Sequence, residues 1–387
     1  MSFSPFLLLI LLAFNVAHAW RHGAPITLPI LRRRIGIDPL KEDKMVLTFG
    51  VFQVEGLPGL QNWLLYKPPV ARPKPSSKCV LFFPGDISDF AGSCRMGPYS
   101  IEALAWVVAQ RFQPDDHLVV VRAQSFNDMF AVYSNFLPVD HTGSPTTQPP
   151  NHSAVTHLQR LLANLDRHIR TPATPSFSCA GSSCSRNDDE NGAWGTQCVP
   201  LRDCCDGDGL ASRHDDMNGD DMALAARPMT LVGFSKGGVV LNALMREGGR
   251  GDFWSRVDAV HFVDAGLNTR GVFPLTSKEL ETLRQHVSGS FAVYLHGTPR
   301  QLSDKARPWI GEEFRDFFQR GRASGIRFVS LEYLKKTPAT LNSHFEALRV
   351  FATNETQAAN NPFLNGPHTP NGRCFFDEWM HQSLAGS

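Results

Sequence analysis

The chain lacks long hydrophobic runs, an excess of either charge, and glycine motifs for nucleotides. The apolar run at residues 6–14 is too short to cross a bilayer comfortably, so we expect no transmembrane span in the mature chain. The formal net charge is only +1, and no basic stripe alternates with aromatic side chains, which argues against nucleic acid as a partner. Neither Gly-x-Gly-x-x-Gly nor Gly-x-x-x-x-Gly-Lys-Ser/Thr occurs, so we expect no nucleotide cofactor.

Five of the eight cysteines crowd one polar insertion, contain no Cys-x-x-Cys pair and have no histidine partners at ligand spacing, so we expect no metal site. The aspartates of the cysteine-rich insertion at residues 171–227 resemble a calcium loop only loosely, because the expected glycine and terminal glutamate are misplaced. In an oxidising compartment, disulfides could instead staple the polar insertion that holds five of the cysteines: Cys179, Cys184, Cys198, Cys204 and Cys205.

The 387 residues are 42% apolar and 10% aromatic, enough to bury a large core. We expect one α/β domain over residues 45–351, with an irregular insertion at 171–227 and a poorly ordered tail at 352–387. Residues 1–44 read as a targeting segment. Ala17-His18-Ala19 suits signal peptidase and favours secretion, whereas the basic, acid-free stretch before Asp38 suits a mitochondrial presequence.

Strand and helix patterns alternate along the expected domain. Two extended segments, 45–55 and 62–67, form a hairpin around Gly56-Leu57-Pro58-Gly59. Helix patterns begin near Ser100 and Ser153 and at residues 238 and 309. Buried strands are expected at 79–83, 117–122, 229–232, 257–263, 291–295 and 326–331. This alternation predicts an α/β fold with a mostly parallel sheet, helices on both faces and an antiparallel N-terminal edge.

Residues 229–245 read as a strand that breaks at Gly233-Phe234-Ser235-Lys236-Gly237 and restarts at once as a helix. This is the arrangement of a nucleophile elbow. A Cβ at Gly233 or Gly237 would collide with a neighbouring strand or helix, and the serine would adopt a strained backbone conformation. We therefore predict that Ser235 is a nucleophile.

A neutral serine requires a base, and the base requires an acid to orient it. His344 follows the last expected strand and is the candidate base; the alternative is a solvated loop histidine. The candidate acids are Asp264, directly after the strand at 257–263, and Asp304, after the strand at 291–295. We favour Asp264 slightly, although it could merely cap a turn. Asp304 could instead place its negative charge at the N-terminus of the next helix.

The predicted oxyanion donors are the backbone N–H of Lys236 and that of Gly85 or Asp86, in the turn expected to face the elbow. The Asp86 carboxylate would oppose an oxyanion unless it points away or is paired. The Lys236 side chain either favours negative charge near the site or is a surface lysine anchored by its stem.

Several segments together resemble a family of α/β-hydrolase-like mitochondrial proteins, whose human member is named after a chromosome 2 open reading frame. They are Val80-Leu81-Phe82-Phe83-Pro84-Gly85-Asp86, residues 231–241, Thr298-Pro299-Arg300-Gln301, Arg307-Pro308-Trp309-Ile310-Gly311 and Asn342-Ser343-His344-Phe345. The resemblance covers roughly residues 79–170 and 228–351. It implies an α/β-hydrolase fold, a serine-hydrolase-like site at Ser235 and His344, and a location in mitochondria. The cysteine-rich insertion falls where family members vary.

Two functions are compatible with these patterns. The leading hypothesis is hydrolysis of a small-molecule or lipid ester or thioester through an acyl-Ser235 intermediate. The alternative is an inactive hydrolase-fold protein that binds a protein partner or a lipid, because a fold does not dictate its function. A carboxylate placed next to His344 would favour the first.

Overall fold

The computed structural model describes residues 26–29, 46–93, 99–146, 153–170, 222–266, 269–271 and 275–353. Most of the expected targeting segment (1–44), of the insertion (171–227) and of the tail (352–387) lies outside these ranges. The five clustered cysteines also lie outside them, so the disulfide expectation is not addressed.

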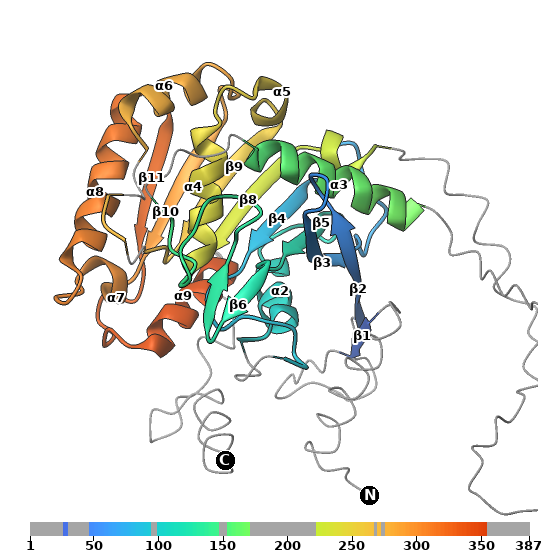
Figure 1. Ribbon diagram of the computed structural model, residues 1–387, viewed down its shortest axis with the longest axis horizontal. Helices are drawn as coiled ribbons and strands as arrows, with labels where there is room; N and C mark the ends of the chain where they lie inside the picture. Colours follow the sequence, from blue (N-terminus) through green and yellow to red (C-terminus); the bar gives the residue numbers. More distant parts are fainter. Residues whose placement is uncertain are drawn as a thin grey trace, which may run out of the picture.

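Nine strands form one sheet in the order β1-β2-β3-β5-β4-β8-β9-β10-β11 (Figure 1). The first four are joined by antiparallel pairing, and the last six, from β5 onward, are parallel. The strands are β1 (Ile26–Pro29), β2 (Val46–Glu55), β3 (Gln61–Lys67), β5 (His117–Val121), β4 (Cys79–Phe83), β8 (Met229–Phe234), β9 (Val257–Val263), β10 (Ala292–Gly297) and β11 (Arg327–Glu332).

Helices cover both faces of this sheet. On one face lie α2 (Ile101–Ala109) and α9 (Leu341–Thr353), which pack side by side (Figure 1). On the other lie α3 (Ala154–Arg170), α4 (Gly238–Arg246), α6 (Ser277–Arg284) and α8 (Pro308–Ala323). Short helices are η3 (Leu224–Ala226), η4 (Ser235–Gly237), α5 (Gly251–Trp254) and α7 (Pro299–Leu302).

Two hydrophobic cores result from the alternation of side chains along the central strands. In β4, Leu81 and Phe83 face the core beneath α3 and α4, whereas Val80 and Phe82 face the core beneath α2 and α9. Every side chain of β4, β5 and β8 is buried. Their apolar composition therefore reflects burial on both faces, as parallel strands under two helical layers require.

The architecture is an α/β-hydrolase fold, as the sequence predicted: a mixed, mostly parallel sheet, helices on both faces and a strand-turn-helix at β8. The strands expected at 79–83 and 257–263 have those same bounds. The antiparallel edge includes a further strand, β1, formed by residues 26–29 of the stretch expected to be a targeting segment.

Helix α9 was not predicted, and it contains His344, which the sequence placed on a loop. The helix begins with a reciprocal pair of bonds: Thr340 N donates to Ser343 Oγ at 3.0 Å, and Ser343 N donates to Thr340 Oγ1 at 3.2 Å. Such reciprocal bonds satisfy amides that the first helical turn leaves unpaired. The helix reaches Thr353, two residues beyond the domain boundary expected at residue 351.

In the part of the chain that the structure describes, no helix combines the length and the apolar character needed to cross a membrane. The same ranges contain no cluster of three or more His, Cys, Asp or Glu side chains that could hold a metal ion.

Candidate active site

Ser235 lies where β8 ends, in the 3₁₀ turn η4 that leads directly into α4. Its φ is 51°, in the left-handed region that residues other than glycine seldom adopt. Ser235 is partly exposed, whereas its neighbours Phe234 and Lys236 are buried. A strained residue held in this way is typical of functional sites, and here the turn presents the serine at the carboxyl edge of the sheet.

Glycines allow the backbone to pack closely around this turn. A Cβ at Gly237 would lie 1.9 Å from Phe83 O in β4, and one at Gly233 would lie 2.8 Å from the Leu241 side chain. A Cβ at Gly85, after β4, would lie 2.5 Å from the Ser235 Cβ. The turn after β4 is therefore in direct contact with the elbow.

His344 and Asp264 form a buried hydrogen-bonded pair beside the elbow. His344 Nδ1 donates to Asp264 Oδ2 at 2.6 Å, and the two residues are 5% and 0% exposed. Because a carboxylate accepts at Nδ1, the neutral ring has its lone pair at Nε2. The ring stacks on Phe234, the residue before Ser235, with 4.7 Å between ring centroids.

The sheet register brings Asp264 close to Ser235. Phe234 of β8 pairs with Val263 of β9, so Ser235 and Asp264 occupy the next position on neighbouring parallel strands. Asp264 also has a positive φ, 46°. Ser235 Oγ makes no hydrogen bond with another described residue, His344 included; in free enzymes, contacts between a nucleophile and its base are often long.

Asp304 lies elsewhere. Its carboxylate accepts from Ala306 N and from Arg307 Nε, both at 2.8 Å, in the turn before α8. The Ala306 N–H, followed by the Arg307 side chain, lowers the pKa of Asp304 below its usual value. Of the two candidate acids, the structure therefore places Asp264, and not Asp304, against His344.

Three backbone N–H groups near Ser235 have no hydrogen-bond partner among the described residues: those of Gly85, Asp86 and Lys236. Gly85 and Lys236 are buried. Buried amides in folded proteins are nearly always paired, so a group of free ones suggests a place for an acceptor atom from a ligand. These are the amides that the sequence predicted as oxyanion donors.

The Asp86 carboxylate is engaged by β7 (Phe130–Val132), because Ala131 N donates to Asp86 Oδ1 at 2.8 Å. Burial raises the pKa of Asp86, while the Lys236 ammonium, the Ala131 N–H and His344 act against this rise. Lys236 is only 5% exposed, so it is not the stem-anchored surface lysine that the sequence left open.

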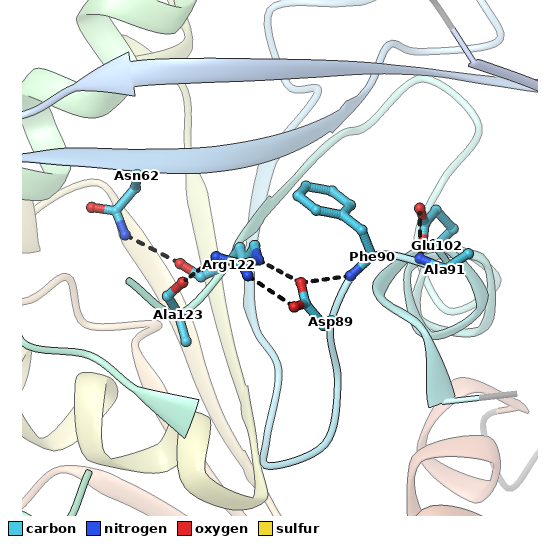
Figure 2. Close-up of polar contacts among 7 residues, drawn as sticks. All are labelled: Asn62, Asp89, Phe90, Ala91, Glu102, Arg122 and Ala123. Atoms are coloured by element: carbon cyan, nitrogen blue, oxygen red, sulfur yellow. Dashed lines mark hydrogen bonds and ion pairs between the residues drawn. The ribbon is translucent and has the colours of Figure 1, made fainter. Parts of the chain in front are cut away.

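The loop that follows Asp86 is fixed to Arg122, the residue directly after β5, and to α2 (Figure 2). Asp89 accepts from Arg122 Nε at 2.5 Å and from Arg122 Nη2 at 2.8 Å, and it also accepts from Phe90 N. The buried Glu102 carboxylate of α2 accepts from Ala91 N at 3.0 Å. An ion pair and a buried carboxylate thus hold the loop that begins with Gly85 and Asp86.

Thr298 and Gln301 contact Asp264, and sequence reasoning gave them no role. Thr298 N and Oγ1 donate to the two Asp264 carboxylate oxygens at 2.7 and 2.9 Å. Gln301 Nε2 donates to Asp264 O at 3.2 Å. The available signal was Thr298-Pro299-Arg300-Gln301, which carried the family resemblance and directly follows β10.

Solved structures of esterases share similarity with this chain. Esterase Est22 is 12% identical with a TM-score of 0.41, and the match covers 83% of this chain and 81% of that one. Esterase LipW from Mycobacterium marinum is 11% identical with a TM-score of 0.39, covering 82% and 83%. These values are low, and the assignment of the fold rests on the strand order and the elbow described above.

Sequence comparison gives closer relatives. The mitochondrial protein C2orf69 homologs of Danio rerio and Mus musculus are each 29% identical, over 70% of this chain and over 72% and 77% of their own lengths. The mitochondrial protein C2orf69 of Homo sapiens is 26% identical over 82% of this chain and 84% of its own length. The model of the C2orf69 family matches residues 50–327, well over half of the sequence, and the chain therefore belongs to that family.

Proposed function

We propose that this protein is a serine hydrolase that cleaves an ester or thioester through an acyl-Ser235 intermediate. The observation that carries the proposal is the buried His344–Asp264 pair, joined at 2.6 Å, beside a serine held at a positive φ. Among the described residues, the unpartnered amides of Gly85, Asp86 and Lys236 supply what a developing oxyanion requires.

In the first step, His344 Nε2 takes the hydroxyl proton of Ser235 as Oγ attacks the carbonyl carbon of the substrate. The resulting oxyanion accepts hydrogen bonds from the free amides, and Asp264 stabilises the imidazolium. His344 then gives the proton to the leaving alcohol or thiol as its bond to carbon breaks. His344 Nε2 then takes a proton from a water molecule as the water oxygen attacks the acyl carbon. The ring returns this proton to Ser235 Oγ as the bond from Oγ to the acyl carbon breaks and the carboxylic acid leaves.

The alternative is a hydrolase-fold protein without turnover that binds a lipid or a protein partner. The position of Asp264 favours the enzyme, because binding alone requires no imidazole oriented by a carboxylate. An elbow serine and a histidine without this acid would have favoured the binding protein.

Labelling with a fluorophosphonate probe tests the proposal. The wild type is expected to react at Ser235, and Ser235→Ala and His344→Ala are expected to label at least about 1,000-fold more slowly. Ser277→Ala, which changes an exposed serine of α6, is the matched control and should label like the wild type. A folded wild-type protein that shows no Ser235-dependent labelling would support the binding protein instead.

We further propose that the protein acts in mitochondria, in the matrix. The support comes from the relatives, which are named mitochondrial proteins. Residues 1–44 fused to a fluorescent protein should direct it to the matrix, resistant to protease in intact mitochondria. Entry of that fusion into the secretory pathway would contradict this location.

A further inference from the structure

Residues 129–142, here called the brace, contact both sides of the candidate oxyanion hole. One side is the turn after β4, residues 84–87, and the other is Lys236 in the elbow. These two sides are far apart in the sequence, and a short segment between β5 and α3 bonds to each of them.

Three hydrogen bonds join the brace to the turn after β4. Tyr133 Oη donates to Pro84 O at 2.7 Å, Ala131 N donates to Asp86 Oδ1 at 2.8 Å, and Ile87 N donates to Met129 O at 2.8 Å. Tyr133 is 1% exposed. The bonds lie on both sides of Gly85 and thus restrict the position of its amide.

The other side is held by the Lys236 ammonium. Lys236 Nζ donates to Thr142 O at 3.1 Å and lies 5.7 Å from the centroid of the Phe130 ring. Burial of an ammonium costs free energy unless polar or charged groups compensate it. Thr142 O, the Phe130 ring and the nearby Asp86 carboxylate provide this compensation, so the side chain is held between the elbow and the brace.

The Thr142 carbonyl is itself held in a compact turn. Asp140 Oδ1 accepts from Thr142 N at 2.8 Å and from Ser144 N at 2.9 Å. Gly143 has a φ of 70°, and a Cβ there would lie 2.1 Å from Ala131 O, so this turn packs directly on β7. Lys236 therefore bonds to a rigid acceptor.

We propose that Lys236 is a positioning residue. Its ammonium bonds to the brace, and the brace bonds to the turn after β4. This link sets the distance between the backbone N–H of Lys236 and the backbone N–H groups of Gly85 and Asp86. This inference rests on the proposed function, because it concerns the donors for the same oxyanion. The role belongs to the side chain and is distinct from that of the Lys236 backbone N–H.

Lys236→Met tests the role, because it keeps the backbone N–H and most of the stem but removes the charge. We expect the maximal rate of fluorophosphonate labelling to fall about 10- to 100-fold, because displacement of catalytic groups by about 1 Å has effects of this size. The probe concentration that gives the half-maximal rate should stay within about twofold of the wild-type value, since the Lys236 side chain is not assigned to probe binding. Lys236→Arg should recover part of the rate, and Lys278→Met, at an exposed lysine of α6, should leave it unchanged.

Amide hydrogen exchange gives a second measurement that does not depend on catalysis. Lys236→Met and Tyr133→Phe should each speed exchange of residues 84–93, while Lys278→Met should not. If the wild type does not label, the proposed function fails. Hydrogen exchange alone then tests whether Lys236 and the brace hold the turn after β4 in place. The inference would be overturned if residues 84–93 of Lys236→Met exchanged at the wild-type rate. It would also be overturned if Lys236→Met were labelled at the wild-type rate.

Discussion

At the scale of single residues, Asp264 holds the site together. Its two carboxylate oxygens accept from His344 and twice from Thr298, and its backbone oxygen accepts from Gln301. One aspartate thus joins the end of β9 to the end of β10 and to the first turn of α9. Its position between these elements explains why it is fully buried.

Asp264→Asn is expected to slow fluorophosphonate labelling about 1,000-fold or more, because an amide no longer fixes the tautomer of His344. The rate of labelling at saturating probe is the measurement. Asp304→Asn is the matched control, since Asp304 bonds only to its own turn among the described residues, and it should label within about twofold of the wild type. The opposite ranking of the two variants would show that Asp264 is not the acid.

The sequence could predict Ser235 and its acid candidates because the elbow has a local pattern. The sequence favoured Asp264 over Asp304 only slightly, because the choice depends on how β9, β10 and α9 meet in space. The two bonds from Thr298 to Asp264 are likewise invisible locally, since the two residues lie 34 positions apart.

At the scale of elements, α2 holds the loop that leads from the turn after β4. Glu102 in its first turn is 3% exposed and accepts from Ala91 N (Figure 2). Burial raises the pKa of Glu102 from 4.5 to about 7, while bonds from its own backbone N–H, the Ala91 N–H and Ser100 act against the rise.

This pKa predicts how Glu102 affects stability. Between pH 4.5 and about 7 the folded state binds the Glu102 proton more tightly than the unfolded state, so the contribution of Glu102 to stability falls as pH rises through this window. Glu102→Gln does not titrate, so its Tm relative to that of the wild type should rise by roughly 5 °C from pH 4.5 to pH 8. Thermal unfolding followed by circular dichroism is the measurement.

Glu281→Gln, at an exposed glutamate of α6, is the control and should show no such trend. A constant Tm difference between Glu102→Gln and the wild type across this range would mean that Glu102 titrates normally in the folded protein.

Sequence predicted the elements with a strong local pattern better than those without one. The apolar run of β4 and the helical spacing of α3 are strong patterns, and both elements were expected. β6 (Ser125–Asn127) and β7 have three residues each, too few for a periodic pattern, and they form through pairing with one another. Helix α9 was missed because its start depends on the reciprocal bonds of Thr340 and Ser343.

At the scale of the whole molecule, the described chain that resumes at residue 222 contacts α3. Asp166 Oδ1, one turn before the end of α3, accepts from Leu224 N of η3 at 3.2 Å. The two described segments that border residues 171–221 are therefore in contact.

Replacement of residues 174–219 by a short Gly-Ser linker should leave a folded protein, because shortening a loop between close ends costs little free energy. Labelling at Ser235 should stay within about threefold of the wild-type rate, and Tm within about 5 °C. Thermal unfolding and labelling measure both quantities. Loss of cooperative unfolding would mean that the replaced residues form part of the core.

The position of His344 on α9 has a consequence for when activity can begin. Ser235, Asp264 and the amides of Gly85 and Lys236 all precede residue 300, whereas the imidazole belongs to the last helix that the structure describes. That helix packs against α2, so docking of Phe345 and Phe351 completes one core and delivers the base in a single event. Under the proposed function, a nascent chain, or a product of premature termination before Leu341, would carry the serine but lack its proposed base.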